Sequence, residues 1–139
     1  MTYKLTIHEK STYLHAVVTG RNSRENVERY LAEILRECAA RNCFTVLIEE
    51  RLDGPRLQTG EVFEIATEGS RKAGGQLRAI AYVDVNAEGA LMHFAETVAV
   101  NRNLPVTVFL NVADAERWLL RSDRLGSERT PGDAEEPRR

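Results

Sequence analysis

Strands and helices alternate almost without linkers near the end of this chain, and this alternation constrains the fold more than any other feature. Residues 87–100 have the spacing of an amphipathic helix, residues 106–110 form a short β run, and residues 111–120 have the pattern of a capped helix. Such alternation requires crossover connections, which produce an open sheet with helices packed on it. The pattern therefore predicts an α/β fold, although a fold of this kind does not by itself indicate a reaction.

Composition limits the classes of protein to which the chain can belong. With 139 residues, 42% of them hydrophobic, it is one domain that can bury a core without disulfides or metals. A net charge of −2 provides no overall attraction to nucleic acid or anionic membranes. No stretch approaches the length of a membrane span, and the N-terminus lacks the apolar run of a signal peptide. We expect a cytoplasmic protein with no nucleic-acid partner and no integral membrane segment.

The apolar periodicity predicts a mixed sheet of four to five strands with four helices. Residues 3–8 and 12–19 alternate as an antiparallel hairpin, and three parallel strands are expected at 44–48, 77–83 and 106–110. The helices are expected from Asn22 or Ser23 to Cys38, and over 60–72, 87–101 and 111–120. Trp118 lies on the apolar stripe of the last helix, so we expect it in the core.

The composition changes after Arg121. Residues 122–139 contain no aromatic residue and one leucine, mixed with charges, glycine and proline. Such a segment buries too little apolar surface to order itself. We therefore expect one domain over residues 1–121, followed by a disordered tail over 122–139.

The order of elements resembles the STAS fold, the anti-sigma-factor-antagonist domain. Residues 94–119, FAETVAVNRNLPVTVFLNVADAERWL, carry this resemblance as a helix, a short strand with a V-x-V-F run, and a closing helix that contains Trp118-Leu119. The chain is similar in particular to STAS-like bacterial proteins that are also compared with CRAL-TRIO lipid-binding domains. The resemblance implies a regulatory or protein-interaction module without catalytic activity.

STAS regulators carry a phosphorylatable serine in an Asp-Ser-Ser-Gly-like turn between the third strand and the second helix. In this chain Thr59 and Gly60 stand at the Ser-Gly step, and Leu57 or Gln58 replaces the acidic residue expected before it. The resemblance thus implies that Thr59 is a candidate phosphoacceptor. Thr59 also has a simpler interpretation, because threonine is a favoured helix N-cap. The two roles are compatible, since a helix N-terminus stabilises a phosphate.

Acidic residues follow the strand expected at 44–48. Glu49, Glu50 and Asp53 could serve general acid–base or metal chemistry, because ligands of open α/β sheets bind beside the strand ends. Arg51 and Arg56 lie in the same segment and would neutralise them. We interpret these acids as a solvated loop.

Histidine and cysteine offer no stronger candidate for chemistry. His8 and His15 could be neighbours across the hairpin, but no acid or cysteine accompanies them at ligand spacing. His93 lies between apolar residues of a helix and is interpreted as structural. Cys38 and Cys43 are interpreted as buried, reduced thiols. We therefore expect no catalytic residue, no metal site and no cofactor.

The loop before the second helix is the expected functional surface. It leaves the end of a buried strand, contains Gly54-Pro55 and leads into a helix N-terminus that attracts anions. The expected binding residues are Leu52, Asp53, Arg56, Leu57, Thr59 and Gly60. We expect a protein partner or a second copy of the chain. The alternative function is a carrier of a small apolar ligand, held between the sheet and the helices at 60–72 and 87–101.

Overall fold

The computed structural model describes residues 3–54, 57–73, 76–84 and 106–128, together with Thr97 and Asn101. Five strands and three helices lie in this part of the chain: β1 (Tyr3–Glu9), β2 (Leu14–Arg21), α1 (Arg24–Arg41), β3 (Thr45–Asp53), α2 (Thr59–Ala73), β4 (Ala79–Asp84), β5 (Val106–Phe109) and α4 (Val112–Glu128). The predicted α/β class is confirmed. Within the described ranges, no helix is both long and apolar enough to cross a membrane.

The five strands form one mixed sheet in the order β1-β2-β3-β4-β5. β1 and β2 are antiparallel, as the predicted hairpin requires, and β2 to β5 are parallel to one another. The central strand β3 continues to Asp53, beyond the predicted end at residue 48. Glu49, Glu50 and Leu52 therefore belong to the sheet.

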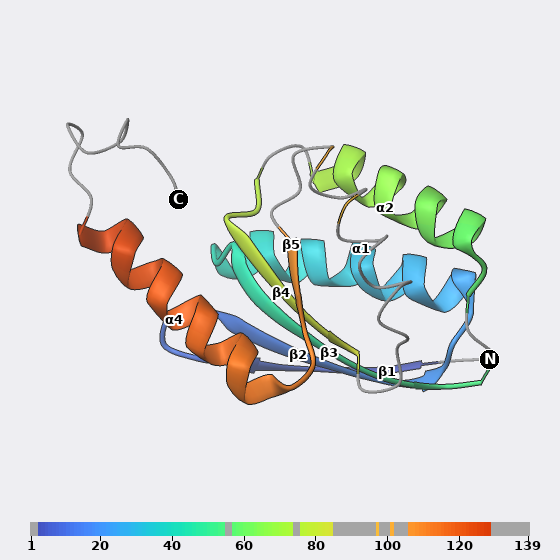
Figure 1. Cartoon of the computed structure of the whole chain (residues 1–139), viewed down its shortest axis with the longest axis horizontal. Helices are drawn as coiled ribbons and strands as arrows, with labels where there is room; N and C mark the ends of the chain where they lie inside the picture. The colour runs from blue at the N-terminus through green and yellow to red at the C-terminus, as the bar shows by residue number, and fades with distance from the viewer. Residues whose placement is uncertain are drawn as a thin grey trace.

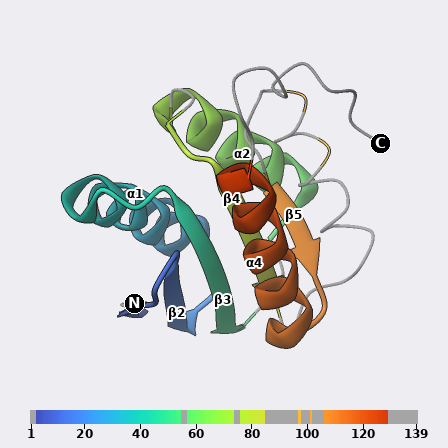
Figure 2. The same cartoon turned by 90° about the vertical axis from the view of Figure 1, so that its left-hand side faces the viewer.

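Helices cover both faces of the sheet. Figures 1 and 2 show α1 and α2 on one face and α4 on the other, where α4 packs over β3, β4 and β5. A separate apolar cluster fills each interface. The cluster under α1 and α2 contains Leu14, Ala16, Val18, Val27, Tyr30, Ile34, Cys38, Val46, Ile48, Leu52, Ile65 and Ile80. The cluster under α4 contains Tyr13, Leu47, Ala79, Ala81, Val83, Ala115 and Leu119.

Side-chain caps determine where two of the helices begin. The Ser23 hydroxyl accepts a hydrogen bond from the backbone N–H of Asn26 at 3.1 Å, so Ser23, and not Asn22, is the N-cap of α1. The predicted cap of the last helix is confirmed. Asn111 Oδ1 accepts a hydrogen bond from the N–H of Asp114 at 2.8 Å.

Two predicted segments differ from the structure or lie outside its described part. The helix predicted over 87–101 falls outside the described residues, apart from Thr97 and Asn101, which are helical, so this fourth helix stays a prediction. α4 continues to Glu128, into the segment expected to be a tail. Once a helix has formed, each further residue adds a hydrogen bond, and neither glycine nor proline follows Arg121 until Gly126. The tail prediction is therefore wrong for residues 122–128, and residues 129–139 lie outside the described part.

Trp118 packs on one side against the cluster under α4. Its ring centroid lies 5.5 Å from that of Phe109, and the side chain is half-buried. We expect Trp118→Ala to lower the free energy of unfolding by about 3 kcal/mol, the lower end of the range for aromatic truncation in a core. Urea denaturation measures this change. Leu120→Ala on the same helix is the control, because Leu120 is 46% exposed and its truncation should cost about 0.5 kcal/mol or less.

Candidate functional site

Part of the segment that was expected to be the binding loop belongs to the hydrophobic core. Leu52 lies in β3, is 1% exposed and belongs to the cluster under α1 and α2, so its predicted role in a binding surface is wrong. Strand alternation is the reason, because it places Leu52 on the same face as Val46 and Ile48. Leu57 is half-buried against the same cluster. Asp53 is exposed, and Arg56 lies outside the described residues.

The start of α2 differs from the predicted one. The backbone carbonyl of Gln58 accepts a hydrogen bond from the N–H of Val62 at 3.0 Å, and the Glu61 carboxylate accepts one from the N–H of Gln58 at 2.9 Å. Gln58 therefore occupies the N-cap position, and the predicted capping role of Thr59 is wrong. Thr59 is the first residue of α2, followed by the exposed Gly60. Glu61 reaches back to the cap as in one half of a capping box.

A truncation of Leu52 distinguishes a core residue from a binding residue. We expect Leu52→Ala to lower the free energy of unfolding by about 2–5 kcal/mol, because it removes a fully buried side chain and leaves a cavity. Chemical denaturation measures the loss. A loss below about 0.5 kcal/mol is typical of an exposed position and would contradict the placement of Leu52 in the core.

An open groove of about 430 Å³ lies between α1 and α2, along the middle and the end of α2. Its lining comes from both helices of this face: Arg24 and Glu28 of α1, and Phe63, Glu64, Thr67, Glu68 and Lys72 of α2. Arg24 pairs with Glu28 at 3.1 Å and forms an ion pair with Glu64, which joins the two helices. Phe63 is 41% exposed, a large apolar side chain among charged neighbours. The groove thus has an aromatic side chain and a polar rim.

The interpretation of Glu49 and Glu50 as a solvated loop is wrong. Both carboxylates lie in the central strand β3, and each residue is only 5% exposed. Because successive side chains of a strand point to opposite faces, Glu50 faces α1 and α2 while Glu49 faces the side of α4. A buried charge requires compensation by partners on its own side. Each carboxylate has such partners.

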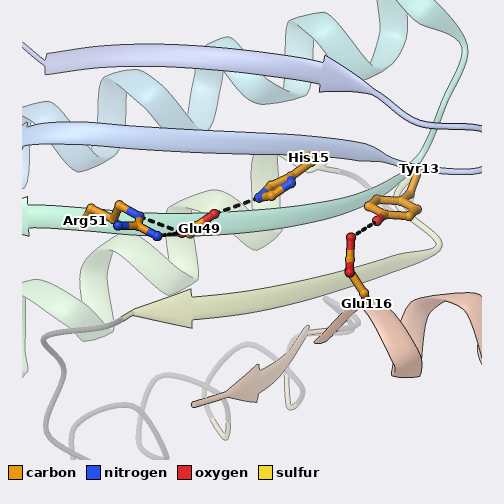
Figure 3. A network of polar contacts seen from close by, with 5 residues as sticks. All are labelled: Tyr13, His15, Glu49, Arg51 and Glu116. Atoms are coloured by element: carbon orange, nitrogen blue, oxygen red, sulfur yellow. Dashed lines mark hydrogen bonds and ion pairs between the residues drawn. The ribbon is translucent and has the colours of Figure 1, made fainter. Parts of the chain in front are cut away.

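Glu49 is held from two directions (Figure 3). Its Oε1 lies 2.9 Å from His15 Nε2, and its Oε2 accepts a hydrogen bond from Arg51 Nε at 2.6 Å. Burial would raise the pKa of Glu49, but the hydrogen bonds with Arg51 and His15 and the positive charge of Arg51 outweigh this effect, so the pKa lies below its usual range. Glu49 is therefore a carboxylate near neutral pH.

Glu50 is compensated by tyrosines on the opposite face. The Tyr82 hydroxyl donates to Glu50 Oε2 at 2.6 Å, and the Tyr30 hydroxyl lies 3.0 Å from that of Tyr82. Because the proton of Tyr82 points to Glu50, the Tyr30 hydroxyl is the donor in the second bond. Burial, together with the charge of Glu50, raises the pKa of Tyr82 well above its usual value. This chain of hydrogen bonds joins α1 to two central strands.

Sequence reasoning missed these partners because they are distant in the chain. Thirty-four residues separate His15 from Glu49, and thirty-two separate Glu50 from Tyr82. A third contact of this kind joins the β1–β2 turn to α4, where the Tyr13 hydroxyl donates to Glu116 at 2.6 Å (Figure 3). The suggestion that His8 and His15 are neighbours is confirmed, since they are directly opposite in the β1–β2 ladder.

The remaining candidates for chemistry lie apart from these networks. Cys38 and Cys43 are free thiols, and burial raises the pKa of Cys38 to about 11, which keeps it protonated and unreactive. Among the residues that the structure describes, no group of three His, Cys, Asp or Glu side chains is placed to hold a metal ion. The space expected to hold an apolar ligand is bounded by residues 87–101, most of which fall outside the described part.

Protonation of Glu49 should contribute to acid denaturation. The pKa of Glu49 is lower in the folded protein than the value of 4.5 expected for the unfolded chain. The ionised carboxylate therefore contributes its full stabilisation above pH 4.5, and this contribution is lost as the pH falls through the lower pKa of the folded state. We expect the free energy of unfolding of the wild type to decrease more steeply below about pH 4.5 than that of Glu49→Gln. Urea unfolding across this range is the measurement. Glu25→Gln, an exposed acid of α1, is the control and should retain the wild-type slope.

Comparisons with known proteins support the fold. No protein-family model matches the chain, and no curated protein matches it. A similar solved structure is the crystal structure of an uncharacterised protein from the DUF3478 family with a SpoIIAA-like fold, from Shewanella loihica PV-4. It is 21% identical, the match covers 84% of this chain and 93% of that chain, and the TM-score is 0.53. The STAS-like resemblance is therefore confirmed as a likeness of fold.

Proposed function

We propose that this protein is a regulatory protein-interaction module without catalytic activity, and that it binds a partner protein over the groove between α1 and α2. The exposed Phe63 is the observation that carries this proposal. Aromatic side chains surrounded by polar groups are the usual anchors of protein interfaces, because they bury a large apolar area with little loss of conformational entropy. Regulation by protein contact also fits a SpoIIAA-like fold.

The charges around Phe63 support a protein partner over a small apolar ligand. Arg24 and Lys72 contribute positive charge to the rim, and Glu28, Glu64 and Glu68 contribute negative charge. A rim of both signs can pair with a polar peptide surface and favours one orientation of the partner. Sites for small apolar ligands are instead lined mainly by hydrophobic side chains.

The start of α2 extends this surface toward the loop that the sequence singled out. Gly60 is exposed one turn before Phe63, and Thr59 is the first residue of the helix. A phosphate on Thr59 would be stabilised by the helix dipole and would change the charge beside the groove. Thr59 thus stays a candidate phosphoacceptor within the proposed surface. Asp53 is exposed at the end of β3 and stays a candidate binding residue, and Arg56, outside the described residues, stays one as a prediction from the sequence.

A photocrosslinking amino acid placed at position 63 in the host cell first identifies the partner protein. Replacement of Phe63 then tests the proposal. With the purified partner, we expect Phe63→Ser to weaken binding about 30-fold, the loss of roughly 2 kcal/mol that defines an interface hot spot. Isothermal titration calorimetry measures the dissociation constant. Because Phe63 is exposed, the melting temperature should stay near that of the wild type.

Leu120→Ser provides a matched control, since Leu120 is similarly exposed but lies on α4, on the opposite face of the sheet. This variant should bind as the wild type does. If the crosslinker at position 63 captures a second copy of the same chain, the partner is that copy and the protein forms a homodimer through this face. Equal weakening by both variants, or crosslinks from position 120 and none from position 63, would overturn the assignment of this face.

A further inference from the structure

We propose that His8 and His15 together bind one divalent transition-metal ion on the face of the sheet opposite the Phe63 groove. The two residues are direct partners in the β1–β2 ladder, and their ring centroids are 5.9 Å apart with the ring planes at 60°. Neither residue takes part in the proposed protein interface. The inference is therefore independent of the proposed function.

The bond to Glu49 fixes which nitrogen of His15 is available. An ionised carboxylate can only accept hydrogen bonds, so Nε2 of the neutral imidazole carries the proton and donates it to Glu49. Nδ1 then presents a lone pair, and no group in the described part of the chain forms a hydrogen bond with it. A histidine that donates one N–H to a buried carboxylate has the orientation and basicity typical of a metal ligand.

Glu49 itself is an orienting group and not a ligand. Its second oxygen is engaged by Arg51, so both oxygens are already in hydrogen bonds. Figure 3 shows Arg51 on the far side of Glu49 from His15. The carboxylate thus stands between the arginine charge and the imidazole, which reduces the repulsion that a bound cation would meet from Arg51.

The separation of the two rings suits a shared ion. With metal–nitrogen bonds of about 2.1 Å, two imidazoles on one tetrahedral ion have centroids roughly 5 Å apart. His8 is exposed, so its side chain can rotate to close the remaining distance. Nitrogen ligands favour zinc, copper and nickel over magnesium and calcium, which prefer oxygen. Water would complete the coordination, because the described residues supply no third ligand.

The test is a titration of the full-length, tag-free protein with zinc chloride and, separately, nickel chloride in a non-chelating buffer. We expect one ion per chain by calorimetry. His8→Ala and His15→Ala should each weaken binding at least about tenfold, and Glu49→Gln should weaken it about 10- to 100-fold, as loss of an outer-shell partner does. Magnesium chloride should give no binding.

Two controls separate this site from other sources of binding. His93→Ala removes the third histidine of the chain and should leave the zinc affinity unchanged. His8→Ala replaces an exposed residue, so its fold, checked by circular dichroism, should be intact even if Glu49→Gln is destabilised. In a nitrogen-detected NMR spectrum, zinc should shift Nδ1 of His15 much more than Nε2. The proposal would be overturned if His8→Ala bound zinc as tightly as the wild type does. It would also be overturned if the wild type bound no zinc at one ion per chain, or if Nε2 of His15 shifted more than Nδ1.

Discussion

The central strand β3 places two consecutive carboxylates inside the molecule, on opposite faces of the sheet. Glu49 and Glu50 are each 5% exposed, and an uncompensated charge at such a position would cost several kcal/mol. No common partner can serve both, because the sheet lies between them. The structure therefore needs a separate set of donors on each side, and these donors connect β3 to its neighbours.

The two sets of donors are chemically different. Glu50 is bonded by the Tyr82 hydroxyl, which in turn accepts from Tyr30 beneath α1 and α2. Glu49 is bonded by a histidine and an arginine, both able to carry positive charge, on the more open side. A buried network of neutral donors fixes the packing of the helices, while the network beside Glu49 fixes the orientation of a histidine near solvent. The two faces can therefore differ in function although they share one strand.

The sequence predicted the elements better than the contacts between them. The hairpin, the parallel strands and the Asn111 cap follow from period-two apolar patterns and from local hydrogen-bonding chemistry, which act over a few residues. Glu49 and Glu50 were misinterpreted because two acids after an apolar run usually mark the end of a strand. Their burial depends on partners more than thirty residues away, which no local pattern contains.

Other differences have the same origin. The sequence predicts a loop at Leu52 because Glu49 and Glu50 interrupt the apolar pattern by which β3 would be recognised. Gln58 takes the cap position that Thr59 was expected to occupy, because Glu61 can reach back to the backbone of Gln58. Local propensity alone favours threonine as the cap, and the contact between Glu61 and the backbone of Gln58 places the cap one residue earlier.

Both carboxylates already accept hydrogen bonds within the protein, and this affects whether either could act as a catalytic group. A general base needs a lone pair that can reach a substrate proton. Both oxygens of Glu49 accept hydrogen bonds within the protein, and Glu50 is enclosed beneath the helices with Tyr82 bonded to it. Turning either group toward a substrate would leave its donors unsatisfied, at a cost of about 1–3 kcal/mol for each buried group. The acids that first suggest chemistry in this sequence thus stabilise the scaffold, whereas the proposed contacts with a partner protein and a metal ion involve Phe63 and His8.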